Sequence, residues 1–207
     1  MEYGIVPTKG NLLSAKKSYK LALLGYELMD KKKNILVREM MGLLDRASEI
    51  QKKINETFLN AYKALQTANI SHGICEKIAY TTAEEKDLNL KFRSVMGVEL
   101  PMVELERKRI ELPYGLASTD AMTDDAYCSF IEVKYLCADL AQVENSVYRL
   151  AMAIKKTQKR ANALKNIIIP KYEYTIKYIT DSLEEKEREE FTRLKVIKNQ
   201  KMKIEEK

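Results

Sequence analysis

Apolar residues recur at alternating intervals of three and four positions from Leu12 to Ala68, and only Lys33 and Thr57 break the series. The mean spacing of 3.5 residues is typical of a left-handed coiled coil rather than of an ordinary amphipathic helix. Because no proline interrupts this stretch, we expect one long helix. The main residues of this first seam are Tyr19, Tyr26, Met29, Leu36, Met40, Leu43, Ile50 and Ile54.

A second series with the same spacing runs from Ala126 to Ile168. Pro170 then interrupts the hydrogen-bond ladder, and the series resumes in a shifted phase at Tyr172. A proline inside a helix lacks the N–H and its ring presses on the preceding turn. We therefore predict a helix from about residue 120 to 201 with a bend near Pro170. The main residues of this second seam are Leu140, Val143, Val147, Leu150, Ile154 and Leu164.

Between the two seams, apolar and polar residues alternate from Leu88 to Phe92, which is the period of a β-strand. Met96 and Gly97 suit a turn. We predict strands at 88–95 and 98–105. A lone hairpin is marginally stable in water, so this one must dock on the helices or on a partner.

These elements predict an all-α protein: a long antiparallel two-helix left-handed coiled coil with a small central β-hairpin and short-helix region. The N-terminal shaft helix is expected at residues 1–72, the central region at 73–119 and the bent C-terminal helix at 120–207. Together they would form one coiled-coil domain.

The composition excludes several other classes. Seven glycines and four prolines in 207 residues are too few for the turns of a doubly wound fold, a sandwich or a barrel. No apolar run is long enough to span a membrane and no signal peptide is apparent, so we expect a cytoplasmic protein. Cys75, Cys128 and Cys137 contain no CxxC pair, and His72 is the single histidine. With no nucleotide-binding motif either, we predict no catalytic residue, metal or cofactor.

Charge is distributed in blocks along the chain, although 36 Lys+Arg against 30 Asp+Glu leave a net charge of only +6. Residues 120–149 carry six acidic side chains and two basic ones, Lys134 and Arg149, whereas residues 155–171 are purely basic. The basic block could attract nucleic acid or an anionic membrane, or it could be a solvated, partner-facing side of a helix. Its main residues are Lys155, Lys156, Lys159 and Arg160.

Several motifs carry a resemblance to a known family. The opening has Pro7-Thr8-Lys9, the centre has Val95-Met96-Gly97-Val98, and the C-terminal part has Lys159-Arg160-Ala161-Asn162-Ala163-Leu164 and Phe191-Thr192-Arg193-Leu194-Lys195. In order and spacing the chain resembles the D subunits of the V/A-type rotary ATPases. It departs from the family at Lys165, where an acidic residue is usual, and at Ala161, where a β-branched residue is usual.

The resemblance implies a non-catalytic rotor axle that couples proton or sodium transport to ATP synthesis or hydrolysis, peripheral to the membrane in the soluble sector of a complex. Its partners would be the catalytic A and B subunits, the F subunit and the funnel-shaped ring-capping subunit of the C/d type, with no nucleic acid and no direct membrane insertion. The alternative is a free-standing coiled-coil adaptor that binds nucleic acid or anionic membrane through the basic block. The residues expected at the hexamer-facing end of the shaft are Lys9, Lys16, Lys17, Arg188, Arg193 and Lys195.

Overall fold

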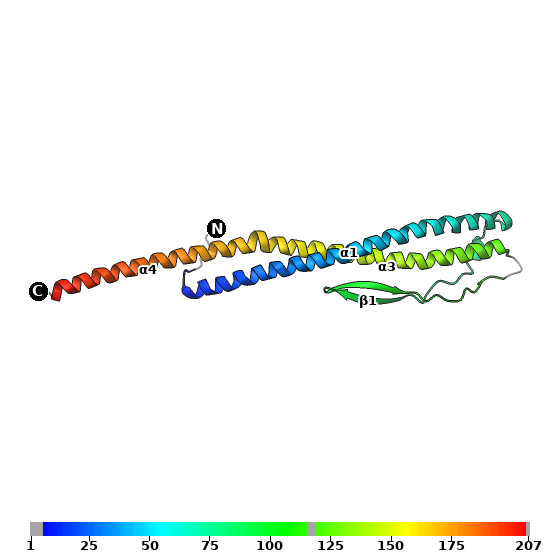
Figure 1. Cartoon of the computed structure of the whole chain (residues 1–207). Coiled ribbons are helices and arrows are strands. Elements are labelled where there is room, and N and C mark those ends of the chain that lie inside the picture. Colours follow the sequence, from blue (N-terminus) through cyan, green and yellow to red (C-terminus); the bar gives the residue numbers. More distant parts are fainter. Residues whose placement is uncertain (1–5, 116–118, 206–207) are drawn as a thin grey trace. The chain divides into compact units, whose positions relative to one another are not determined.

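The computed structural model describes residues 6–115 and 119–205, which are mostly helical (Figure 1). They divide into two compact units, a terminal unit (residues up to 33 and from 156) and a central unit (residues 34–155). The elements are α1 (Lys9–His72), α2 (Glu76–Ala79), β1 (Asn89–Val95), β2 (Val98–Glu104), α3 (Ala121–Ala163), the π-helical turn η2 (Leu164–Ile168) and α4 (Ile169–Glu205).

Helix α1 begins and ends with ordinary capping chemistry. The Thr8 hydroxyl accepts a 3.2 Å hydrogen bond from the Asn11 N–H, as expected of an N-cap residue. At the other end Gly73 adopts φ +78°, and its N–H bonds to the Asn69 carbonyl at 2.9 Å. A glycine in this left-handed conformation satisfies a carbonyl that the helix end would leave unpaired. The first helix therefore ends at His72.

The second long helix is interrupted where the sequence predicts a disturbance. The disturbance is a π-helical turn, η2, which ends two residues before Pro170. Proline cannot donate to the helical ladder and its ring crowds the preceding turn, so a locally wider turn accommodates it. Helix α4 continues beyond η2 to Glu205.

In the terminal unit, α1 and α4 run antiparallel, side by side (Figure 1). Lys9 contacts Glu187 and Tyr19 contacts Glu173. Later residues of α1 therefore contact earlier residues of α4, as antiparallel helices require. Gly25 lies farther along, where an added Cβ would stand 3.8 Å from Leu164 Cδ1. The buried residues between the helices are mainly small, which lets the backbones approach closely: Ala15, Ala22, Ala161 and Ile179.

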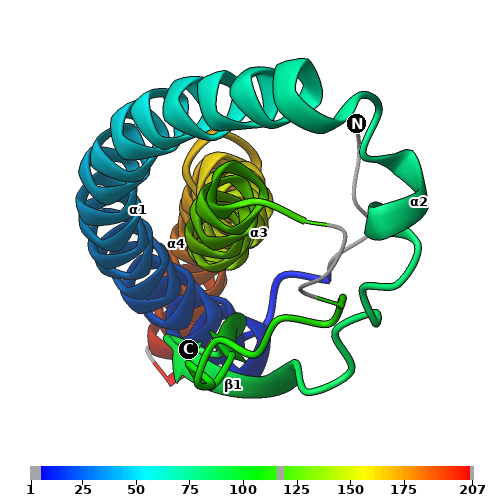
Figure 2. The same cartoon turned by 90° about the vertical axis from the view of Figure 1, so that its right-hand side faces the viewer.

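In the central unit, α1 packs antiparallel against α3 through two clusters. Leu36 and Leu150 are fully buried and meet Leu100 of the hairpin. Farther along, Ile50 and Ile54 pack on Val143. Figure 2 shows α3 between α1 and the segment that leads from α2 to the hairpin. Two chain segments far apart in sequence thus share each cross-section of the core.

The burial pattern follows the 3.5-residue period. Every position of both predicted seams is buried or half-buried, and none is exposed. One buried residue beyond η2, Thr175, lies between the predicted positions Tyr172 and Ile176. Its hydroxyl bonds to the Lys171 carbonyl at 2.8 Å, so the helix itself satisfies this buried polar group. The left-handed supercoil stays a prediction of the period.

The hairpin was predicted to within one residue at its outer ends. Its turn residues Met96 and Gly97 have φ +52° and +76°, as a two-residue type I′ turn requires. Val95 pairs with Val98, and the antiparallel register continues to Asn89 opposite Glu104. Buried Leu100 anchors β2 in the core, whereas β1 is exposed from Asn89 to Ser94.

Replacing Leu36 by Ala tests the buried contact in the central unit. We expect a loss of about 2–5 kcal/mol in the free energy of unfolding, because the truncation leaves a cavity between fully buried side chains. Chemical denaturation measures it. Leu59→Ala on the same helix is the control, since Leu59 is 63% exposed, and it should change stability by about 0.5 kcal/mol or less. Equal effects of the two variants would contradict the packing.

Candidate interaction surfaces

The C-terminal part of α4 is a fully solvated helix in the terminal unit. Every residue from Glu184 to Met202 is exposed. Arg188 lies 3.8 Å from Glu184, and Arg193 lies 3.9 Å from Glu189, both pairs one turn apart. Such exposed pairs contribute little to stability. This segment therefore presents charges that can exchange partners at low cost.

The start of α1 lies beside this segment. Lys9 forms a 3.0 Å ion pair with Glu187, the residue that immediately precedes Arg188 in the sequence. Lys16 and Lys17 are exposed on α1, and Lys195 is exposed on α4. The structure thus places Lys9 beside Glu187, the chain neighbour of Arg188, while the other residues expected at the shaft end lie farther along the two helices.

The basic block is exposed on α3. Lys155, Lys156, Lys159 and Arg160 are all solvent-accessible. Lys165, where the sequence departs from the family pattern, places its ammonium 5.9 Å from the centroid of the Tyr26 ring. This cation–π contact gives the departure a structural role, because it links η2 to a seam tyrosine of α1.

Tyr19 also makes a polar contact across the helix pair. Its hydroxyl donates a 2.8 Å hydrogen bond to Glu173 Oε1. This bond, with smaller contributions from burial and from the carboxylate charge, raises the pKa of Tyr19. The tyrosine therefore packs through its ring and fixes the helix register through its hydroxyl.

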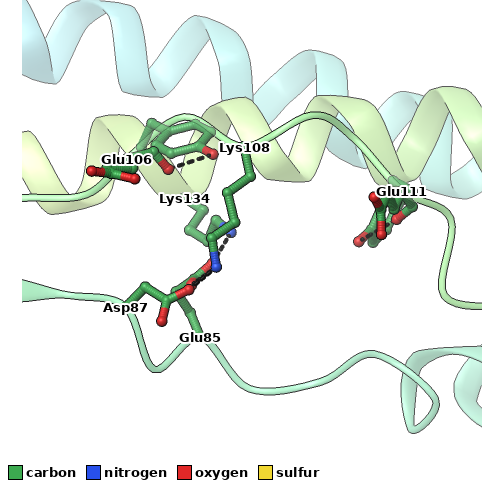
Figure 3. A network of polar contacts seen from close by, with 8 residues as sticks. Glu85, Asp87, Glu106, Lys108, Glu111 and Lys134 are labelled. Atoms are coloured by element: carbon green, nitrogen blue, oxygen red, sulfur yellow. Dashed lines mark hydrogen bonds and ion pairs between the residues drawn. The ribbon is translucent and has the colours of Figure 1, made fainter.

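A polar network in the central unit holds the two connections of the hairpin to α3 (Figure 3). Glu85 accepts a 2.7 Å hydrogen bond from Lys134 of α3. Lys108, on the connection after β2, contacts Asp87 and lies 3.9 Å from Glu85. The hydrogen bond from Lys134 lowers the pKa of Glu85, and the positive charges of Lys134 and Lys108 add to the effect. The network therefore adds polar attachment of the two connections to the anchoring of β2 by Leu100.

A cavity of about 740 Å³ lies between α1, α2, α3 and residues 111–114, which belong to the connection from β2 to α3. Tyr114 donates a 2.8 Å hydrogen bond to Asp124 beside it, and burial, followed by this bond, raises the pKa of Tyr114. Thr123 lines the same cavity; its Oγ1 is buried and has no hydrogen-bond partner among the described residues.

Among residues 6–115 and 119–205 no cluster of His, Cys, Asp and Glu is arranged to hold a metal ion. In the same residues, no helix combines the length and the apolar character that crossing a bilayer demands.

Comparison with known proteins identifies the family. The family model for the ATP synthase D subunit matches residues 11–199. The chain belongs to this family. It is 46% identical over 196 residues to the D subunit of a V-type ATP synthase from Thermotoga neapolitana, covering 94% of this chain and 97% of the relative. It is 39% identical to the D subunit of an A-type ATP synthase from Thermococcus kodakarensis, covering 94% and 93%.

The D subunit is a structural stalk component of V/A-type ATP synthases, so this chain is a non-catalytic component of such a complex. The predicted family and the predicted helix pair with its hairpin are both confirmed.

Sequence reasoning missed the residues that dock the hairpin. A signal was present, because Lys134 and Arg149 are the two cations in the otherwise acidic stretch 120–149. Lys134 binds Glu85, and Arg149 donates to the Glu99 carbonyl at 3.1 Å. Both cations of this acidic stretch therefore have partners on the hairpin or its connection.

Glu85→Gln tests the polar network. Because the pKa of Glu85 is lowered from its ordinary value of 4.5 in the folded protein, its ion pairs stabilise the fold above that pH. The stabilisation is lost as the pH falls through the lowered pKa. The variant should therefore show lower amide protection factors, which are corrected for the intrinsic pH dependence of exchange, in residues 80–88 and 105–112 at pH 7. Acidification should change these protection factors little in the variant and lower them in the wild-type protein.

The neighbouring Glu84→Gln is the matched control, since Glu84 is exposed. It should leave both the exchange rates and their pH dependence as in the wild-type protein. If the two variants behave alike, Glu85 does not anchor the hairpin connections.

Proposed function

We propose that this protein is the central-stalk shaft of a V/A-type ATPase, which transmits torque between the ion-translocating membrane ring and the catalytic A/B hexamer. The observation that carries the proposal is the antiparallel pairing of α1 with the second long helix in each unit, in a chain that belongs to the D-subunit family. Torque needs a stiff element, and interlocked seam side chains on two helices provide one.

A rotor must also turn without stopping at one position of the hexamer. Contacts with the surrounding ring should therefore be weak and replaceable. The exposed end of α4 supports this requirement, because Arg188 and Arg193 form only long, solvent-exposed pairs with carboxylates of their own helix. Screened surface charges of this kind are each worth less than about 1 kcal/mol.

We assign the hexamer-facing end to the terminal unit, where Lys9, Lys16, Lys17, Arg188, Arg193 and Lys195 are exposed. The π-helical turn before Pro170 introduces local asymmetry into the second helix. In this proposal the central unit meets the F subunit and the funnel-shaped ring-capping subunit, and the complex keeps the shaft peripheral to the membrane. The exposed basic block at Lys155, Lys156, Lys159 and Arg160 faces partner proteins.

Reconstitution of the A/B hexamer with and without this chain tests the proposal. With the chain present, we expect steady ATP turnover that persists over many cycles, because an asymmetric shaft moves each catalytic site through its states in sequence. ATPase assays under saturating nucleotide measure it. Turnover that is indifferent to the chain would contradict the proposal, as would tight, salt-sensitive binding of the isolated chain to duplex DNA.

A further inference from the structure

The outer edge of β1 is an open strand edge. The hairpin has two strands, and in the described parts of the chain β1 pairs with β2 alone. Val95 and Val98 flank the two-residue turn and so form a hydrogen-bonded pair. Hydrogen-bonded and non-hydrogen-bonded pairs alternate along an antiparallel ladder. On β1 the non-hydrogen-bonded residues are therefore Leu90, Phe92 and Ser94, and their backbone N–H and C=O groups point away from β2.

The opposite edge of the same hairpin supports this assignment. The residues of β2 that should point outward are Glu99, Pro101 and Val103, and their backbone groups do meet side chains of α3. The Val103 N–H donates to Gln142 Oε1 at 2.7 Å, the Pro101 carbonyl accepts from the Ser146 hydroxyl at 3.5 Å, and the Glu99 carbonyl accepts from Arg149 at 3.1 Å.

The two edges are therefore protected very differently. On β2, a proline removes one donor, and side chains of α3 bond to one backbone group each of Glu99, Pro101 and Val103. Both are usual ways of blocking an edge. On β1, the strand is exposed from Asn89 to Ser94 and contains no proline. An unblocked edge of this length is a template for a further strand.

The side chains of β1 define what that strand must be. Leu90 and Phe92 share one face and are 58% and 56% exposed, although both are large and apolar. Lys91 and Arg93 share the other face, and each ion-pairs with one acid, Glu104 and Glu39 respectively, while staying more than half exposed. A matching strand would place apolar residues beside the first face and acidic residues beside the second.

A second copy of the chain does not fit this edge in the register that overlaps all three outward residues. An antiparallel β1–β1 pair centred on Phe92 would set Lys91 of each copy opposite Arg93 of the other, and like charges directly opposite destabilise a sheet. We propose that the free edge of β1 binds, by strand addition, an extended segment of a different protein in which apolar and acidic residues alternate. This inference goes beyond the shaft function and does not depend on it.

The test uses the isolated full-length chain and a fluorescein-labelled peptide, Thr-Val-Glu-Val-Glu-Val-Thr. Fluorescence anisotropy should give saturable binding, and the amides of Leu90, Phe92 and Ser94 should exchange at least tenfold more slowly with peptide bound. The amides of Lys91 and Arg93, which already face β2, should change little. The same peptide N-methylated at its three valines, and a version with Lys in place of Glu, should bind at least tenfold more weakly.

Phe92→Pro removes the outward N–H without touching the groups that pair with β2, so it should also weaken binding at least tenfold. Phe92→Thr is the matched control, because it keeps the N–H and loses only the aromatic ring, including the contact of that ring with Arg149. Its affinity for the peptide should lie between those of the wild-type chain and of Phe92→Pro. If Phe92→Pro disrupts the hairpin, the N-methylated peptide on the wild-type chain still decides the question.

Three results would overturn the proposal. The first is no binding of the peptide to the wild-type chain. The second is binding that survives both N-methylation and Phe92→Pro. The third is protection of the same amides by self-association of the chain at rising concentration, which would make a second copy the occupant. None of these results bears on ATP turnover by the hexamer, so the shaft function is tested separately.

Discussion

Packing of seam side chains from two distant chain segments is the interaction on which the rest of the structure depends. Each cross-section of the central unit holds one α1 face and one α3 face, as where Leu36 meets Leu150. Burying a leucine side chain contributes about 1.5–3 kcal/mol, so stability accumulates along the helices rather than in one thick core. Where the helices need close approach, as in the terminal unit, alanines and Gly25 replace larger side chains.

The hairpin depends on the same helix pair. Its β2 strand inserts Leu100 into the core and uses polar side chains of α3 as a substitute for a neighbouring strand. The network around Glu85 holds both connections. These contacts cover the β2 edge of the sheet and leave the β1 edge open. The protein therefore has an exposed strand edge in addition to its exposed helix faces.

The sequence predicted the helices, the hairpin and the family, because each depends on local periodicity or on motifs. The 3.5-residue repeat identifies seam positions without knowledge of their partners, and Met96-Gly97 fixes the turn. The form of the disturbance near Pro170 could not be predicted from the sequence. A kink and a π-helical turn can both accommodate the lost hydrogen bond and the steric clash of a proline. Contacts such as Lys134 with Glu85 or Lys165 with Tyr26 join residues that only the folded chain brings together.

Direct observation of rotation tests the central claim. A bead attached at Tyr80→Cys, a position 80% exposed in the central unit, with the native thiols replaced by serine, would be followed on a surface-immobilised A/B hexamer during ATP hydrolysis. The account predicts sustained turning in one direction whose speed follows the hydrolysis rate. A bead that stays still, or only fluctuates, while the hexamer hydrolyses ATP at its full rate would contradict it.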